Sequence, residues 1–248
     1  MRMDGRALGS CAALVFVLVI AAPGCDSSSP TEVAPTPSPA TVVFSDPAAL
    51  ADHQATITSL ILDTYSLATA AIPVGVVRVV VSVDAPRSIP GWGLGGYALG
   101  PNEIEIVVDP EFIGLAQILP ARLPHIVAHE LHHAVRWRSP GPYRTLLEAL
   151  VSEGLADHFG VELLSGQVPP WSRAFPEGGT EGYLDRARED FDNAAFDFEA
   201  WFFGVGTDLP RWTGYTLGFR LVRDYLEANP GLSAAQLVDV SAQALRPD

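Results

Sequence analysis

The hydrophobic positions of the chain follow a helical spacing first and a strand pattern next. At Asp46 a capping residue precedes a proline, and hydrophobic residues then recur three or four positions apart. This spacing predicts a helix of about six turns that ends before Pro73. Residues 74–83 are almost continuously hydrophobic and largely β-branched, which predicts a strand buried on both faces.

Two further strands are expected next, joined by a tight turn. Residues 97–99 and 103–108 flank the turn formers at 100–102. In the second segment, β-branched residues alternate with Glu103 and Glu105, so one face should be buried and the other exposed. A half-exposed edge strand beside a cleft could bind an extended peptide by strand addition, although an ordinary edge strand shows the same alternation.

Helical spacing dominates the second half of the chain, and proline and glycine mark where each helix stops. The order of strands and helices indicates an α+β fold. The segments expected to be helical run from about 120–124 to 138, from 143 to 164, from 181 to 203 and from 212 to 228, with a short last helix capped by Ser233 and Gln236.

The N-terminal segment has the features of a targeting signal. Arg2 and Arg6 precede a hydrophobic run at 12–22 that is too short to span a bilayer comfortably, so residues 1–24 are interpreted as a signal peptide. The sequence that ends at Cys25 resembles the lipobox of bacterial lipoproteins, which implies a lipid anchor on that cysteine. Ordinary signal cleavage with an unmodified cysteine is the alternative.

A tether is expected to separate this signal from the folded part. Residues 25–40 are rich in proline and serine and have no core-forming periodicity, which predicts a disordered segment. The folded domain is expected at 41–248, with a helical subdomain from about residue 166. An exported protein of the bacterial cell envelope follows from this organisation, lipid-anchored or otherwise secreted or periplasmic.

Charge and cysteine usage narrow the classes of partner and of metal ligand. The chain has 15 basic residues, all of them arginine, against 29 acidic residues, which gives a formal net charge of −14. Such a surface repels nucleic acid and anionic membranes, so neither is expected as a partner. Cys11 and Cys25 both lie in the N-terminal segment, so no thiolate ligand or disulfide is expected in the folded body.

The chemistry of the chain is concentrated in an HExxH motif. His129 and His133 are four residues apart, so on a helix they share one face and can bind one metal ion. Catalytic zinc usually takes three protein ligands and keeps one position for water. Glu153 is 20 residues after His133 on the next expected helix and could complete the set, while Asp157 lies on the same helix face as Glu153.

Other sets of metal ligands are possible from the same residues. A His125/His129 pair is geometrically possible but leaves Glu130 and His133 without a role. His132 is turned about 100° from His133 and is expected behind the ligands or at the surface. His53 is interpreted as a structural or exposed histidine. A metzincin would need a glycine and a histidine where Arg136 and Ser139 stand, and a deformylase-like site would need a cysteine.

The spacing of these residues resembles that of the gluzincin zinc peptidases, exemplified by thermolysin. In these enzymes a glutamate ligand follows the motif by about twenty residues, and an aspartate follows the glutamate by four. The segments 129–136 and 147–158 resemble more specifically a bacterial family of predicted zinc-dependent proteases. A glycine- and tyrosine-rich segment at 214–219 is similar as well, and the resemblance covers roughly residues 95–228.

The resemblance implies a zincin-like fold, in which a small sheet with a half-exposed edge strand packs on the HExxH helix and a mostly helical part follows. It implies one zinc ion held by His129, His133 and Glu153, with a zinc-bound water activated by Glu130 as general base. A carboxylate one residue after a ligand lies beside the metal and can reach such a water. Asp157 would bind the free ring N–H of a histidine ligand.

Stabilisation of the oxyanion requires a further hydrogen-bond donor. Tyr215 is the first choice, although a core tyrosine would explain it equally well, and Tyr183 and His158 rank behind it. The leading hypothesis is a zinc metallopeptidase that acts on peptides or proteins. A non-catalytic envelope lipoprotein that binds zinc or a protein partner is the alternative, and a helical domain without metal is the third. The cleavage specificity, endopeptidase or exopeptidase action and the oligomeric state stay open.

Overall fold

A computed structural model of the chain describes residues 39–176 and 178–247. The expected signal peptide at 1–24, Cys25 and nearly all of the expected tether lie outside these residues. Among the described helices, none combines the length and the hydrophobicity that a membrane span requires.

Four strands of the described chain form one sheet in the order β1-β2-β4-β3. The strands β1, β2 and β4 are parallel, and β3 pairs antiparallel with β4 at the edge. The edge strand beside the helices is therefore β3, whereas β4 lies inside the sheet. The bounds are Ala40–Phe44 for β1, Val77–Val83 for β2, Leu94–Gly100 for β3 and Glu103–Val108 for β4.

The start of the fold differs from the sequence-based expectation. β1 was not predicted, and α1 spans Gln54–Ala71 instead of beginning at Asp46. The carboxylate of Asp46 accepts the backbone N–H groups of Ala48 and Ala49, each at 3.1 Å, so it caps a turn that precedes the helix. An aspartate followed by proline is typical of both structures, and here the turn is formed.

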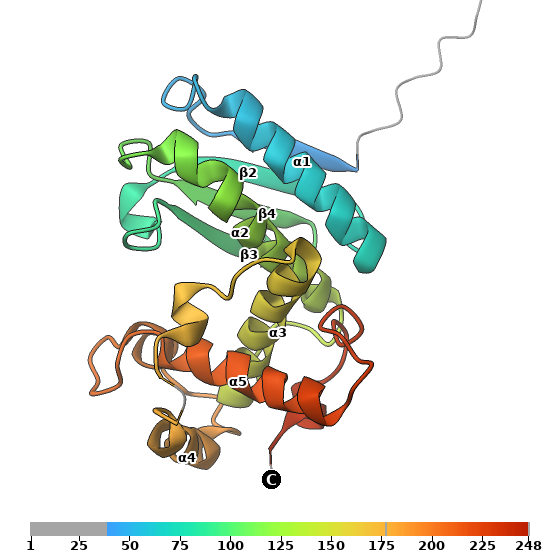
Figure 1. Cartoon of the computed structure of the whole chain (residues 1–248), viewed down its shortest axis with the longest axis vertical. Helices are drawn as coiled ribbons and strands as arrows, with labels where there is room; N and C mark the ends of the chain where they lie inside the picture. The colour runs from blue at the N-terminus through green and yellow to red at the C-terminus, as the bar shows by residue number, and fades with distance from the viewer. Residues whose placement is uncertain (1–38, 177, 248) are drawn as a thin grey trace, which may run out of the picture. The chain divides into compact units, whose positions relative to one another are not determined.

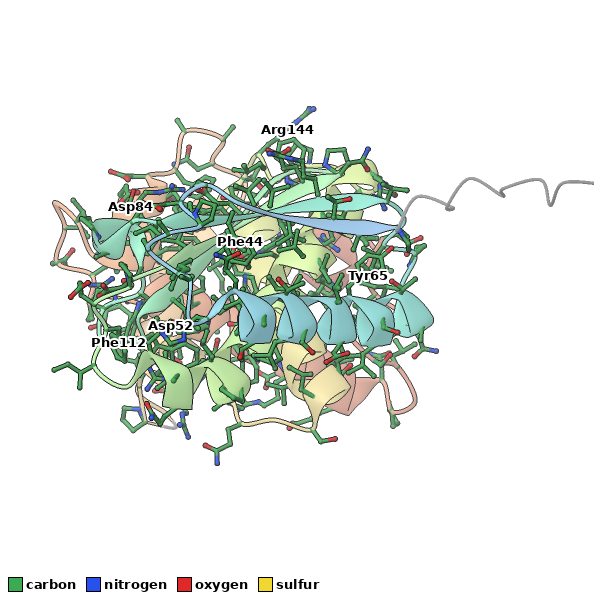
Figure 2. All side chains as sticks on the ribbon, turned by 90° about the horizontal axis from the view of Figure 1, so that it is seen from above. Phe44, Asp52, Tyr65, Asp84, Phe112 and Arg144 are labelled. Carbon is green, nitrogen blue, oxygen red and sulfur yellow. The ribbon has the colours of Figure 1, made fainter. Side chains whose placement is uncertain are left out.

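The helices α1 and α2 cover one face of the sheet (Figure 1). Alternate valines and isoleucines of β2 and β4 are fully buried beneath them, whereas Arg78 and Glu103 form a partly exposed ion pair on the opposite face. The prediction that β2 is buried on both faces was therefore wrong, because helices cover only one of them. Figure 2 shows α1 alongside the sheet, where the Tyr65 hydroxyl donates to the carbonyl of Gly75 at 2.6 Å.

Three long helices position the site. α2 spans Leu115–Arg138 and carries the HExxH motif, and α3 spans Leu146–Leu164. α3 begins at a capping box in which the Thr145 hydroxyl accepts from the backbone N–H of Glu148 and the Glu148 carboxylate accepts from that of Thr145. α5 spans Thr213–Ala228 and packs across α3 (Figure 1).

The crossing of α3 and α5 depends on two glycines. A Cβ atom on Gly154 would lie 2.2 Å from the carbonyl oxygen of Gly218, and one on Gly218 would lie 2.1 Å from the carbonyl oxygen of Leu150. Only glycine, which has no Cβ atom, permits such a close approach of two helix backbones. Because Gly154 follows Glu153 directly, this contact places the expected third ligand beside α5.

The rest of the C-terminal part is less regular than predicted. α4 spans only Glu181–Asp190, and a turn separates it from a single turn of π-helix, η3, at Glu199–Phe203. The side-chain oxygen of Asn193 accepts the backbone N–H of Ala195 at 2.8 Å, so it forms a local turn where the sequence predicted continuous helix. Short 3-10 helices lie at Ala85–Arg87 (η1), Pro170–Arg173 (η2) and Ala242–Leu245 (η4).

The expected last helix after Ser233 is also replaced by turns. The predicted contact exists, since the backbone N–H of Gln236 donates to the Ser233 hydroxyl at 3.3 Å. However, the buried guanidinium of Arg136 donates to the carbonyl oxygens of Val238 at 3.0 Å and of Val240 at 3.2 Å. These carbonyls therefore bind the HExxH helix instead of a helix of their own.

Candidate metal centre

α2 and α3 bring three ligand atoms together. Nε2 of His129 lies 2.9 Å from Nε2 of His133 and 3.2 Å from Oε2 of Glu153, and the last two atoms are 3.4 Å apart. Ligands at about 2.0–2.1 Å from a tetrahedral zinc ion lie about 3.3 Å from one another. The three predicted ligands therefore form a triangle of the size that zinc requires.

Hydrogen bonds on the far side of each ring decide which nitrogen faces this triangle. Nδ1 of His129 lies 2.7 Å from the Asp157 carboxylate, and Nδ1 of His133 lies 3.2 Å from the hydroxyl of Ser152. Because a carboxylate only accepts, Nδ1 of His129 carries the proton and Nε2 of the neutral ring is a lone-pair donor to a cation. Two imidazole nitrogens and a carboxylate oxygen are the ligand types that zinc prefers, so the residues fit this metal.

The same contacts shift the pKa values of the site. Burial lowers the pKa of His129, but the charge of Asp157 and the hydrogen bonds that the Asp157 and Glu153 carboxylates accept outweigh it and raise the pKa well above the usual value. Burial raises the pKa of Glu153, yet the charge of His133 and the contacts with both histidines outweigh it and lower the pKa to about 2. The site therefore combines an ionised Glu153 carboxylate with a His129 ring that is protonated on both nitrogens, and so positively charged, when no metal is bound.

Asp157 is fully buried and receives four hydrogen-bond contacts from the described residues. Oδ1 faces His129 and, at 3.3 Å, Nε2 of His125. Oδ2 accepts from the indole N–H of Trp171 at 2.9 Å and from the hydroxyl of Ser172. His125, His129 and Asp157 also offer close ligand atoms, but the hydrogen bonds satisfy this carboxylate without a second ion. Sequence reasoning missed Trp171 and Ser172, since neither stands in a motif.

Glu130 lies beside the triangle and is buried, with 6% of its surface exposed. Burial raises the pKa of Glu130, and the positive charges of His129 and His133 oppose this. The side chain passes directly over β3, where a Cβ atom on Gly96 would lie 2.6 Å from Oε1. Gly96 is a site residue that the sequence analysis did not single out, although a glycine inside a strand signals close approach of another group.

Two cavities of the described structure meet at His129 and Glu130. The Trp171 cavity, about 480 Å³, extends along the start of β3 and is also lined by Ile89, Trp171 and Trp212. The Tyr143 cavity, about 470 Å³, extends toward the end of β3 and is also lined by Ala98, Trp137, Tyr143 and Phe198. A groove with hydrophobic walls therefore passes the ligand triangle on both sides.

The three expected oxyanion donors lie in different places. Tyr215 is half-buried and lines both cavities, and burial together with the nearby charges of Glu153 and Asp157 raises the pKa of its hydroxyl well above the usual value. Tyr183 packs against Phe175 at a ring distance of 5.6 Å and lines neither cavity. A ring nitrogen of His158 lies 2.9 Å from the carbonyl oxygen of Phe219, so this histidine faces the α5 backbone.

The structure also gives the positions of His132, His53 and Tyr143. His132 is fully buried, 5.3 Å from the ring of Phe159, so the surface position considered for it was wrong. His53 is half-buried and is the N-cap residue of α1. Tyr143 was not predicted; it lies in the cavity that also touches His133 and Glu153, and its pKa is raised by burial and by the charge of Glu153.

Comparison with known proteins places this site in a family. Residues 94–246 match the family described as "Predicted Zn-dependent protease (DUF2268)". The uncharacterized protein YjfC of Bacillus subtilis (strain 168) is 29% identical over 154 residues, which are 54% of this chain and 47% of YjfC. The chain thus matches about half the length of that relative, and no solved structure matches. The matched region contains His129, His133, Glu153 and Glu130, and the chain belongs to the family of predicted Zn-dependent proteases.

Proposed function

We propose that this chain is a zinc metallopeptidase that hydrolyses peptide bonds with Glu130 as general base. The observation that carries the proposal is the triangle of His129, His133 and Glu153 beside a buried glutamate, at the meeting point of two cavities. A family described as zinc-dependent proteases supports the reaction class. Such a site combines a metal, a base and space for a substrate, which hydrolysis of an amide requires.

A bound zinc ion would polarise the substrate carbonyl and make the attacking water more acidic. Glu130 takes the proton of that water, because its carboxylate is buried next to the ligands and does not belong to them. Its raised pKa brings it closer to neutral pH, where a general base can also return a proton to the leaving amine. Tyr215 is the described residue best placed to donate a hydrogen bond to the oxyanion, since it lines both cavities.

The edge of β3 supports a peptide substrate. The backbone N–H of Asp109 donates to the carbonyl oxygen of Gly93 at 2.9 Å, so these two residues are a hydrogen-bonded pair of the antiparallel ladder. Because hydrogen-bonded and non-hydrogen-bonded pairs alternate along β3 and β4, the backbone N–H and C=O groups of Gly96 and Ala98 point away from β4. No described group bonds to the outward backbone groups of Gly96 or Ala98, and both residues line the Tyr143 cavity. An extended peptide can use these groups by strand addition and place its scissile bond at Glu130.

We further propose that the protein is exported and is anchored to the cell envelope through a lipid on Cys25. The hydrophobic run and the lipobox-like sequence before this cysteine support the location. Fractionation of cells that express the full chain tests it, since Cys25→Ser should release the protein from the membrane fraction. Nucleic acid is not expected as a partner because of the net charge of −14.

Zinc analysis and a peptide cleavage assay test the enzymatic proposal together. The purified protein should contain one zinc ion and cleave peptides from a mixed library, and removal of the metal should abolish cleavage reversibly. Bound zinc without any cleavage would favour the non-catalytic alternative, and a protein that binds no zinc would contradict both.

A further inference from the structure

Trp171 contacts the metal centre from outside the two ligand helices. It belongs to η2, which follows α3, and its side chain is buried with 4% of its surface exposed. The indole N–H donates to Oδ2 of Asp157 at 2.9 Å, and the hydroxyl of Ser172 donates to the same oxygen. The other oxygen of Asp157 faces Nδ1 of His129 at 2.7 Å.

These bonds restrict rotation of the Asp157 carboxylate. An aspartate side chain can turn about the bond to its carboxylate, and that terminal torsion has only broad preferences. Two donors on Oδ2 hold the carboxylate plane, so Oδ1 stays directed at His129. Since the bond to Asp157 selects the tautomer of His129, a freely turning carboxylate would fix that ring less well. Trp171 thus acts on a predicted ligand through one intervening side chain.

η2 is itself held by α5. The hydroxyl of Thr216 donates to the carbonyl of Trp171 at 2.8 Å and accepts from the backbone N–H of Ala174 at 3.2 Å. The ring of Trp171 packs edge-on against Trp92, with 4.7 Å between the centroids. Trp171 thus lines the Trp171 cavity while its indole N–H donates to Asp157.

We propose that Trp171 is a positioning residue for the metal: its indole N–H fixes Asp157, and through Asp157 it fixes the orientation of His129. Ser172 assists on the same oxygen. The inference rests on the proposed function, because it requires that His129 binds zinc. It adds a group that neither the HExxH motif nor the downstream glutamate and aspartate contain.

The test measures zinc binding to the full metal-free chain by competition with a chelating indicator. Trp171→Phe keeps an aromatic ring in the cavity wall but removes the N–H, and Ser172→Ala removes the second donor. Mutation of a direct partner of a metal-bound histidine typically weakens metal binding about 10- to 100-fold. Removal of one of several donors that act one residue further from the metal should therefore weaken zinc binding about three- to tenfold. The two changes together should weaken it further.

A matched control and a spectroscopic reading separate positioning from general damage. Trp92→Phe makes the same ring change at the neighbouring tryptophan, which contacts Trp171 but not Asp157, and should leave the zinc affinity within about twofold. Cobalt substituted for zinc should show an altered absorption spectrum in Trp171→Phe but not in Trp92→Phe, because the spectrum reports ligand geometry.

The role of Trp171 and the proposed function can fail separately in these experiments. Unchanged zinc affinity in Trp171→Phe would overturn the role of Trp171 and leave the zinc site standing. If Trp171→Phe does not fold, Ser172→Ala alone decides, with the same threefold threshold for zinc affinity. A wild-type chain without zinc affinity would overturn the proposed function and this inference together.

Discussion

Nδ1 of His129 lies 2.7 Å from Oδ1 of Asp157, and both side chains are buried. This contact keeps a proton on Nδ1, so Nε2 is the ring nitrogen that faces His133 and Glu153. In the proposed zinc site, Asp157 would therefore determine whether His129 presents a lone pair or an N–H to the ion.

Asp157→Asn should weaken zinc binding about 10- to 100-fold, because the amide lacks the charge that stabilises the His129 ring in its metal-binding form. Chelator competition on the purified protein measures the change. Asp52→Asn, at an exposed position before α1, is the matched control and should leave the affinity unchanged. Equal zinc affinity in the two variants would show that the Asp157 contact has no role in metal binding.

Gly96→Ala should impair catalysis without removing the metal. The new methyl group would lie 2.6 Å from Oε1 of Glu130, so the carboxylate must move, and a displacement of about 1 Å can cost about 100-fold in rate. Steady-state kinetics should show a lower kcat at full zinc content. Gly100→Ala on the same strand meets no atom within 4 Å and should keep wild-type kcat; a similar loss in both variants would implicate the strand rather than Glu130.

The contact between α3 and α5 predicts a stability effect. Gly154→Ala forces two helix backbones apart, since its Cβ would lie 2.2 Å from the carbonyl oxygen of Gly218. Overpacking of this kind typically lowers the free energy of unfolding by about 1–3 kcal/mol. Urea denaturation measures the loss. Gly182→Ala on α4 has open space around it and should leave the stability unchanged or slightly raised, so comparable losses would contradict the crossing described.

Zinc binding should release a proton and strengthen as the pH rises. The pKa of His129 is raised well above its usual value, so near neutral pH the metal-free ring is protonated, whereas a ligand must be neutral. Zinc must displace this proton, and the apparent affinity should rise with pH until the pH exceeds the raised pKa. Calorimetric titrations in two buffers of different ionisation enthalpy count the protons. Identical heats in both buffers would contradict a protonated His129.

The convergence of His129, His133 and Glu153 could be predicted from the sequence because it depends on local helix geometry. His129 and His133 share a face by the helical repeat, and the long predicted helix at 143–164 carries Glu153 and Asp157 on one face. The existence and order of the main helices and of three strands followed from hydrophobic spacing in the same way.

Features that depend on tertiary contact could not be predicted. The partners of Asp157 on η2 come from a turn whose sequence has no motif, and Gly96 matters only because Glu130 packs over it. The break after α4 arises where the side-chain oxygen of Asn193 accepts the backbone N–H of Ala195, although the hydrophobic spacing continues through it. Local side-chain hydrogen bonds and helix crossings thus outweighed periodicity at these positions.

In the proposed reaction, Glu130 activates the attack on the peptide bond while His129, His133 and Glu153 hold the metal. The most direct measurement compares wild type with Glu130→Gln for zinc content and for kcat on a peptide that the wild type cleaves. One zinc ion is expected in both proteins, together with a loss of kcat of at least about 100-fold in the variant, within the range of general-base catalysis. Equal kcat in the two proteins at equal zinc content would contradict it.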